Sequence, residues 1–262
     1  MGNPFFRFKQ FTVWHDKCAM KVGTDGVLLG AWCHLGGLTV DNAQCTILDV
    51  GTGSGLIALM LAQRMIDGGQ CTMHDWVHID AIDIDPQAVE QATYNFGHSP
   101  WTKRLHAHLC SLQQVSPLRG DLEGSFPTNY DLIVSNPPYF VDSLKNPDKG
   151  RELARHTDTL SYEDLLRHSA RLLKEHGTLA LVLPATAEEQ IIRLASVQGL
   201  YPTRLTRVFS KPDHPTPIRI LIEFVKSASN LKGGIEEHSL YIESAHSPRS
   251  EEYAEMTKDF YL

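Results

Sequence analysis

Short apolar runs alternate along the chain with segments whose apolar residues recur at helical spacing. An apolar, β-branched run of about four to eight residues between turn residues indicates a buried strand, whereas spacings of three and four indicate a helix. Strands that alternate with helices predict a doubly wound, mostly parallel sheet. The runs that read as strands comprise residues 46–48, 77–83, 105–109, 130–135, 178–183, 205–209 and 218–224. We therefore expect an α/β fold with a seven-stranded sheet.

Local signals mark where several helices begin and end. Pro86 follows Asp85 at the favoured first position of a helix. Ser161 and Asp164 have the spacing of a capping box. Apolar residues then keep helical spacing from Leu165, and we expect Gly177 to end that helix.

A glycine-rich turn follows the first strand and precedes a predicted helix at 56–62. Its sequence is Asp49-Val50-Gly51-Thr52-Gly53-Ser54-Gly55. This layout brings a nucleotide against a helix N-terminus in α/β proteins. The glycine spacing differs from the dinucleotide fingerprint, and the Asp49 carboxylate favours a cationic group over a phosphate. Asp83 ends the next strand and provides a carboxylate suited to the two hydroxyls of a ribose.

The strand at 130–135 stops at Asn136-Pro137-Pro138-Tyr139. Two prolines remove ladder N–H donors and fix two φ angles, so the chain must leave the sheet there. The turn offers an amide oxygen, proline carbonyls and an aromatic face, which together suit a planar amine or amide. The same four residues also fit a strand-end turn with one capping Asn.

The glycine turn, Asp83 and Asn136-Pro137-Pro138-Tyr139 together resemble the class I S-adenosylmethionine-dependent methyltransferases of the amino-methylating branch. The stretch from His15 to Trp32 is similar to the bacterial tRNA(Val) adenine-N6 methyltransferases, which modify the adenosine immediately 3′ of the anticodon, position 37. Further matches to that family are Phe8-Lys9-Gln10-Phe11, Ser99-Pro100-Trp101, Arg151-Glu152-x-Ala154-Arg155 and the Phe260-Tyr261-Leu262 ending. The resemblance covers most of the chain.

This resemblance implies a Rossmann-like fold, S-adenosyl-L-methionine as methyl donor, S-adenosyl-L-homocysteine as product and tRNA as substrate. It implies a catalytic turn made of Asn136, Pro137, Pro138 and Tyr139. The cofactor-binding residues that it implies are Thr24, Asp25, Asp49, Gly51, Gly53, Gly55, Asp83, Ile84, Ser111 and Asn136. Ser111 stands where such enzymes often place an Asp toward the cofactor adenine. Thr24 and Asp25 also fit a helix N-cap.

Composition narrows the class of protein. The hydrophobic fraction is 42%, enough for a core, and no window of about eighteen apolar residues predicts a membrane span. The first residues lack the order of a signal peptide. The five cysteines form no C-x-x-C pair and read as reduced thiols of a cytoplasmic protein. Cys71, His74 and His78 lack a second ligand pair, so we expect no metal.

The net charge of −7 is unusual for an enzyme that acts on RNA, because basic surface normally drives nucleic-acid binding. Its distribution is uneven, since segments 1–24 and 203–226 carry more basic than acidic residues and the tail from 227 is acidic. A local basic rim and an ordinary mixed surface are both consistent with this pattern.

We expect a methyltransferase core at 41–226, an N-terminal extension and lid at 1–40, and a C-terminal extension of the same domain at 227–262. No obligate protein partner is predicted. Two alternatives keep the chemistry: N5-glutamine methylation of a peptide release factor, and guanine-N2 methylation of ribosomal RNA. Both would be expected to carry a further domain, and only about forty residues precede the glycine turn. The intact Asn136 turn disfavours a cofactor-sensing binding protein, and the glycine spacing disfavours an oxidoreductase.

Overall fold

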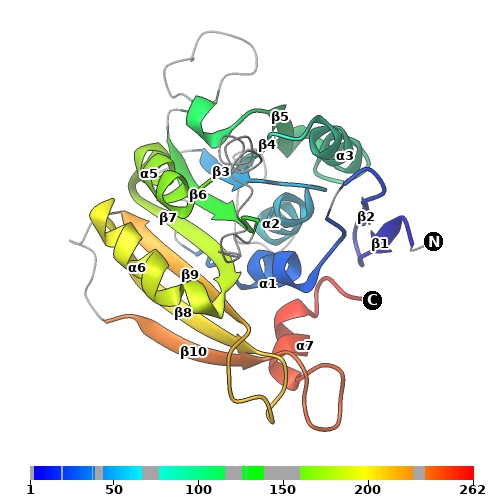
Figure 1. Ribbon diagram of the computed structural model, residues 1–262. Helices are drawn as coiled ribbons and strands as arrows, with labels where there is room; N and C mark the ends of the chain where they lie inside the picture. The colour runs from blue at the N-terminus through cyan, green and yellow to red at the C-terminus, as the bar shows by residue number, and fades with distance from the viewer. Residues whose placement is uncertain are drawn as a thin grey trace, which may run out of the picture.

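A twisted eight-stranded sheet forms the centre of the molecule, in the order β10-β8-β9-β7-β6-β3-β4-β5 (Figure 1). The computed structural model describes residues 3–18, 20–36, 38, 44–66, 77–115, 126–127, 129–138, 160–226 and 234–262. The strands are β3 (Cys45–Val50), β4 (Val77–Asp83), β5 (Leu105–Leu109), β6 (Tyr130–Ser135), β7 (Leu173–Pro184), β8 (Leu200–Phe209), β9 (Arg219–Lys226) and β10 (Glu236–Tyr241). The five neighbouring strands β7, β6, β3, β4 and β5 run parallel to one another, and β9 is antiparallel to both β7 and β8.

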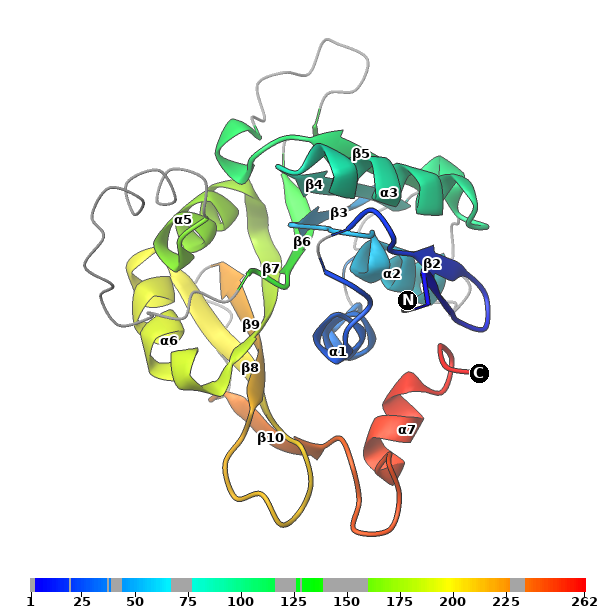
Figure 2. The same cartoon turned by 45° about the vertical axis from the view of Figure 1, so that its right-hand side comes forward.

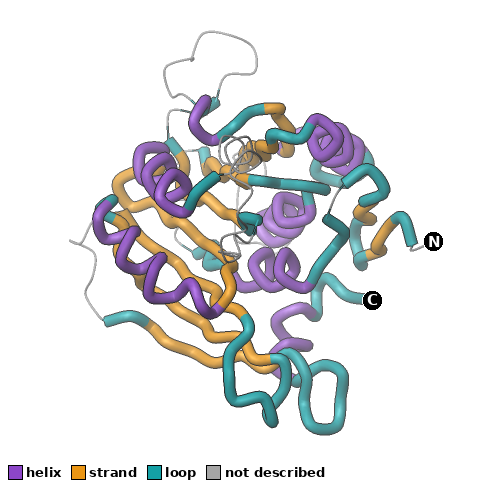
Figure 3. Tube along the Cα trace, viewed as in Figure 1, coloured by secondary structure: helices purple, strands orange, loops and turns teal. Residues whose placement is uncertain are grey.

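Helices cover both faces of the sheet and make three layers (Figure 3). The helices are α1 (Thr24–Trp32), α2 (Leu56–Ile66), α3 (Pro86–Gly97), α5 (Tyr162–Leu172), α6 (Glu188–Val197) and α7 (Glu251–Thr257). One buried apolar cluster joins α1, α2 and α3 to the sheet, and a second cluster joins α5 and α6 to the opposite face. The predicted α/β fold is confirmed, because strands buried on both faces require helices on both sides.

All seven predicted strands are present, but the count of seven is one too low. The additional strand β10 pairs in parallel with β8 at the edge of the sheet. Four of its six residues are exposed polar side chains, and Leu240 is its one buried residue. An edge strand with so few apolar residues has no alternating pattern, so the sequence carried no signal for it.

The helix predicted to run to Gly177 is shorter than expected. α5 ends at Leu172 and β7 begins at Leu173. The register between β6 and β7 shifts between Tyr130 and Leu132, and a Cβ at Gly177 would lie 2.8 Å from the Tyr130 carbonyl oxygen. Gly177 therefore permits a close approach inside a strand irregularity and does not terminate a helix.

Two predicted helix starts are confirmed by their caps. The Asp85 carboxylate accepts from the Gln87 N–H at 2.9 Å, with Pro86 in the first turn of α3. The Ser161 hydroxyl oxygen accepts from the Asp164 N–H at 3.1 Å at the start of α5. Each cap satisfies a helix N–H that has no partner within its own helix.

The two ends of the chain meet beside α1 and α2 (Figure 2). The antiparallel hairpin of β1 (Phe5–Arg7) and β2 (Thr12–Trp14) lies at the N-terminal end. The Lys9 N–H donates to the Phe260 carbonyl oxygen at 2.8 Å, and the Gln63 side chain donates to the Asp259 carbonyl oxygen at 2.9 Å. Within the described residues, no helix is both long and apolar enough to cross a membrane.

Candidate functional site at the carboxyl edge of the sheet

The sheet register brings the predicted motifs to one edge of four neighbouring strands. Val50 at the end of β3 pairs with Ser135 of β6 on one side and with Ile82 of β4 on the other. Adjacent strands lie about 4.8 Å apart. Asn136 and Gly51 therefore start their turns side by side, one residue beyond a paired position. Asp83 of β4 lies on the other side of the glycine turn and pairs with Leu109 of β5.

The glycine turn is fastened to the end of β4 by backbone hydrogen bonds. The N–H groups of Gly51 and Thr52 both donate to the Ile82 carbonyl oxygen, at 2.9 and 3.0 Å. Gly51, Gly53 and Gly55 all have positive φ, at 71°, 55° and 81°. L-residues rarely adopt this region, which explains why the turn repeats glycine at every second position.

The three glycines differ in what surrounds them. No atom lies within 4 Å of a Cβ built at Gly51 or Gly53, whereas a Cβ at Gly55 would lie 2.5 Å from the Phe96 ring. Gly55 is therefore required for packing between the turn and α3. Gly51 and Gly53 instead leave open space along the backbone, where a ligand can approach closely.

The Asp83 carboxylate is oriented by two backbone donors. One oxygen accepts from the Gly53 N–H at 2.9 Å and the other from the Asp85 N–H at 3.0 Å. Each carboxylate oxygen has about two acceptor sites, so hydroxyl donors can still bind. The half-buried Asp83 thus combines a fixed geometry with remaining acceptor capacity.

Asp49 is a buried carboxyl directly beneath the glycine turn, with 0% exposure. One of its oxygens accepts from the Thr52 hydroxyl at 2.6 Å, and its Oδ1 has no hydrogen-bond partner among the described residues. Burial raises the pKa of Asp49 to about 7, and the Thr52 hydroxyl and the Ala58 N–H partly offset that rise. An oxygen without a partner in such a place costs free energy unless a donor or a cation reaches it.

The proline corner begins where β6 leaves the sheet. The Ser135 hydroxyl donates to the Val50 carbonyl oxygen at 2.8 Å and ties the two strand ends together. Asn136 is half-buried, Pro137 is buried and Pro138 is exposed, so the corner spans from the core to the surface. Tyr139 lies outside the described residues.

The N-terminus of α1 lies on the same edge because α1 packs closely along α2. A Cβ at Gly26 would lie 3.0 Å from Leu56, and one at Gly30 would lie 2.8 Å from the Met60 sulfur. These two contacts align the first turns of both helices.

Gly23 is the N-cap of α1 and has no side-chain cap, so neither Thr24 nor Asp25 has the N-cap role that was an alternative for them. Thr24 is exposed, and Asp25 pairs with Arg219 of β9 at 3.0 Å. The sequence held no local signal for this partner, because Arg219 lies 194 positions away.

Ile84 and Ser111 lie at the ends of β4 and β5. The Ile84 side chain is 58% exposed although it is large and apolar. Ser111 begins a short 3-10 helix, η3 (Leu112–Gln114), and its N–H donates to the Gln114 side chain at 3.2 Å. The Cys110 N–H between them donates to the Asp83 carbonyl oxygen at 3.0 Å, which keeps the two strand ends in contact.

The segment from Trp14 to Cys18 borders this edge, as expected of the N-terminal extension, but none of its residues was among the predicted site residues. The Asn95 side chain bonds the N–H and the carbonyl of Trp14 and also donates to the Ser54 carbonyl oxygen at 2.8 Å. Burial, together with the nearby carboxylates of Asp83, Asp85 and Asp16, raises the pKa of Cys18 to about 11. The sequence held no local signal for this link, because Asn95 and Trp14 lie 81 positions apart.

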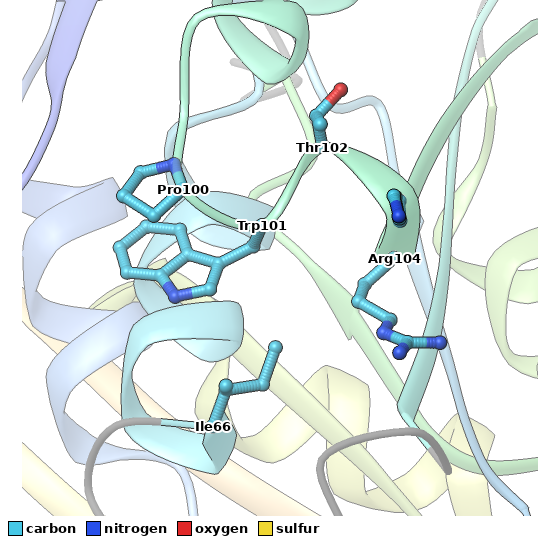
Figure 4. Close-up of a pocket in the computed structure, with 6 residues that line it drawn as sticks. Ile66, Pro100, Trp101, Thr102 and Arg104 are labelled. Atoms are coloured by element: carbon cyan, nitrogen blue, oxygen red, sulfur yellow. The ribbon is translucent and has the colours of Figure 1, made fainter.

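A separate shallow hollow lies at the opposite edge of the sheet (Figure 4). It is lined by the end of α2 and by the turn before β5, with Trp101 packed near Ile66. This hollow contains none of the predicted site residues. No group of three His, Cys, Asp or Glu side chains within the described ranges is placed to hold a metal ion, and Cys71 and His74 lie outside those ranges.

The residues at the carboxyl edge fit S-adenosylmethionine. The open backbone at Gly51 and Gly53 leaves room for an elongated molecule, and Asp83 offers acceptors to hydroxyl groups. The buried Asp49 oxygen without a partner suits the cationic part of such a molecule. Asp49, the glycine turn and Asp83 all lie at the carboxyl ends of the neighbouring strands β3 and β4.

Comparisons with known proteins show which proteins this chain resembles. The family model of the methyltransferase small domain matches residues 35–199. A relative from Parabacteroides distasonis is 50% identical over 100% of this chain and 99% of its own length, and it is named tRNA1(Val) (adenine(37)-N6)-methyltransferase. Relatives of the same name occur in Bacteroides fragilis (47% identical; 100% and 99% covered) and Tolumonas auensis (40% identical; 100% and 98% covered).

Solved structures show the same fold at low identity. A predicted O-methyltransferase from Agrobacterium tumefaciens is similar with a TM-score of 0.61 and 15% identity, covering 90% of this chain and 96% of the other. The tRNA m1G37 methyltransferase of M. jannaschii gives a TM-score of 0.54 at 13% identity, covering 85% and 56%.

Proposed function

The chain belongs to the methyltransferase small domain family, and within it to the tRNA1(Val) (adenine(37)-N6)-methyltransferases, and from this we propose how its residues perform the reaction. The reaction is S-adenosylmethionine-dependent methylation of N6 of adenosine 37 in a valine tRNA. A tRNA substrate further leads us to place the enzyme in the cytoplasm.

The glycine turn and its neighbours would hold the cofactor. Asp83 would accept hydrogen bonds from the ribose hydroxyls, and the open backbone at Gly51 and Gly53 would allow close approach. Asp49 would face the cationic methionine end, with Thr24 and Asp25 beside it at the start of α1. Ile84 would cover one face of the adenine, and Ser111 would accept from its amino group.

The exposed apolar surface of Ile84 supports its place at an aromatic ring. The hydroxyl of Ser111 gives a weaker, uncharged acceptor than the Asp that similar enzymes often use. Gly55 has a different part in this proposal, since it secures the turn against Phe96.

The proline corner would bind the target adenine. S-adenosylmethionine supplies an activated methyl group on a sulfonium, so the protein has mainly to position the acceptor nitrogen. The Asn136 side-chain oxygen and the Pro137 carbonyl would accept the two N–H groups of N6, which favours a pyramidal nitrogen with its lone pair directed at the methyl group. The same acceptors stabilise positive charge as it develops on that nitrogen.

Pro138 completes the corner, and Tyr139 would stack on the base, a contact that contributes about 1–3 kcal/mol in comparable systems. The adenine must leave the stack of the anticodon loop to enter. No general base is needed before transfer, because the amine proton becomes acidic only after the nitrogen has gained the methyl group.

The observation that carries these assignments is the register of β6 against β3. Ser135 lies opposite Val50 and donates to its carbonyl oxygen at 2.8 Å, which supports a shared pocket for the Asn136 corner and the glycine turn. A corner buried in the core or separated from the turn would not serve this chemistry.

The test is methyl transfer from labelled S-adenosylmethionine to bulk tRNA, followed by mass spectrometry of the nucleosides. We expect N6-methyladenosine as the product, and Asn136→Ala should lower kcat by roughly 100- to 1,000-fold. The matched control is Asn129→Ala, because Asn129 is an exposed asparagine at the other end of the same strand. Near-normal turnover by Asn136→Ala would remove this residue from catalysis, and label found in protein alone would favour the release-factor alternative.

A further inference from the structure

Four aromatic rings form a row on the outside of the molecule, next to the glycine turn. Phe5 of β1 packs on Trp14 of β2, with ring centroids 4.8 Å apart. Trp14 meets the edge of Tyr94 at 6.3 Å, and Tyr94 lies over His98 at 4.1 Å with 30° between the rings. We call these four side chains the aromatic row.

The aromatic row is not part of the core. In the β1–β2 hairpin, Phe5 pairs with Trp14 and lies on the outer face, whereas Phe6 lies on the inner face and packs on Phe8. Tyr94 is 45% exposed and His98 is exposed, both on the outer side of α3. The Phe5–Trp14 pair stabilises the hairpin, whereas Tyr94 and His98 pack on each other and still leave ring surface exposed to solvent.

A basic group lies at the hairpin end of the row. Arg7 shares the outer face of the hairpin with Phe5, is exposed, and makes no ion pair within the described part of the chain. Among the nearby carboxylates, Glu90 is paired with Lys17 at 2.5 Å. Arg7 is therefore an exposed cation beside the row in a chain whose net charge is −7.

The row is also close to the site. Asn95 holds both backbone groups of Trp14 and, through a third hydrogen bond, the Ser54 carbonyl oxygen of the glycine turn. When the reacting group of a large substrate lies in the pocket at the carboxyl edge, neighbouring parts of that substrate can therefore contact the row.

We propose that the aromatic row, with Arg7 beside it, binds unpaired nucleotides of the tRNA anticodon loop that neighbour the target adenine. This inference rests on the proposed function. Proteins recognise single-stranded RNA loops by stacking splayed bases on aromatic side chains, and phosphates pair with Arg and Lys. Rings beside a basic residue are the combination that such a segment requires, because the rings can stack with bases while the Arg7 guanidinium pairs with a phosphate.

The experiment measures steady-state methylation of valine tRNA and the affinity for S-adenosylmethionine in the full-length protein. Tyr94→Ala should raise the KM for tRNA about 5- to 100-fold, with kcat at saturating tRNA and cofactor affinity unchanged. Arg7→Ala should reduce the slope of log affinity for tRNA against log salt by about 1. The control is Tyr241→Ala, because Tyr241 is a half-buried ring stacked on Phe209 at 5.0 Å on the opposite side of the sheet.

The outcomes separate this proposal from the one on which it rests. If the wild type methylates tRNA and both Tyr94→Ala and Arg7→Ala keep its KM and salt dependence, the row has no RNA role while the function stands. If the wild type transfers no methyl group to tRNA, both proposals fail. If Tyr94→Ala dissociates an oligomer in sedimentation and the KM follows that change, the row is a contact between copies and the RNA proposal is overturned.

Discussion

Two glycines of one turn should respond very differently to the same substitution. A Cβ at Gly55 would lie 2.5 Å from the Phe96 ring, where φ is +81°. Left-handed backbone costs an L-residue roughly 1–2 kcal/mol. Carbon atoms prefer separations of about 3.5–4.0 Å, so the ring must move by roughly 1 Å. Phe96 is buried, and overpacking of this kind costs roughly 1–3 kcal/mol.

Gly55→Ala should therefore lower the free energy of unfolding by roughly 2–5 kcal/mol, because strain and overlap both act. For a domain near this size that corresponds to a fall in Tm of roughly 5 to 15 °C. The methyl group of Gly53→Ala meets no atom within 4 Å, so this substitution costs only the free energy of the left-handed backbone. Its Tm should fall by roughly 2 to 5 °C, while its affinity for S-adenosylmethionine drops because the new methyl group enters the open space.

Thermal and urea unfolding of both variants, with calorimetric titration of the cofactor, provide the comparison. Phe96→Leu combined with Gly55→Ala tests the cause, since a smaller side chain should recover part of the loss in a double-mutant cycle. Equal Tm values for Gly53→Ala and Gly55→Ala would refute the packing argument. A double variant that shows no coupling would rule out the Phe96 ring as the obstacle.

Three further predictions concern carboxylates of the sheet. Burial raises the pKa of Asp49 in the folded state to about 7 from an ordinary value of 3.8. The folded state therefore binds more protons than the unfolded state between these two pH values, and the free energy of unfolding falls as the pH rises from 3.8 to 7. In urea unfolding between pH 4 and 8, Asp49→Asn should remove this pH dependence, and an unchanged pH dependence would contradict the assignment. Burial acts to raise the pKa of Asp80, but hydrogen bonds from His108, His78 and Tyr130 outweigh it and lower this pKa to about 2. The ionised Asp80 therefore contributes about 2 kcal/mol to the free energy of unfolding above pH 3.8, and this contribution is lost toward pH 2. Asp80→Asn should be less stable than the wild type at pH 7 and approach it at pH 2, whereas an equal loss of stability at both pH values would contradict this reasoning. Asp83→Ala should weaken S-adenosylmethionine binding roughly tenfold or more in calorimetry, because it removes a carboxylate that accepts a hydrogen bond from the Gly53 N–H and would accept others from the ribose hydroxyls. An unchanged affinity would exclude the role of Asp83 at the ribose.

The motifs written in consecutive residues were predictable from the sequence. Gly51, Gly53 and Gly55 all have positive φ, as the repeated glycine indicated, and Asp83 lies beside them because β4 neighbours β3. Parallel strands joined through helices bring their carboxyl ends to one edge, so the order of motifs along the chain was enough. The placement of Asn136 beside Gly51 follows from the same rule.

Features that depend on distant residues were not predictable. Gly177 follows a segment of helical spacing, yet its role is set by the Tyr130 carbonyl oxygen 2.8 Å from its missing Cβ. The ion pair of Asp25 with Arg219 joins residues 194 positions apart. Strand β10 pairs through its backbone and exposes most of its side chains, and backbone pairing leaves no trace in the hydrophobic pattern.

The N-terminal residues frame the site from two directions, and this follows from how they are attached. On one side, Gly26 and Gly30 let α1 lie against Leu56 and Met60, so the start of α1 is aligned with the start of α2. On the other side, Asn95 fixes Trp14 to the glycine turn. Small residues in α1 and one buried amide in α3 therefore determine how a segment of little regular structure borders a pocket. Because neither attachment involves the proposed chemistry, a substitution at Gly26, Gly30 or Asn95 should displace this segment without removing a group that binds the ligand.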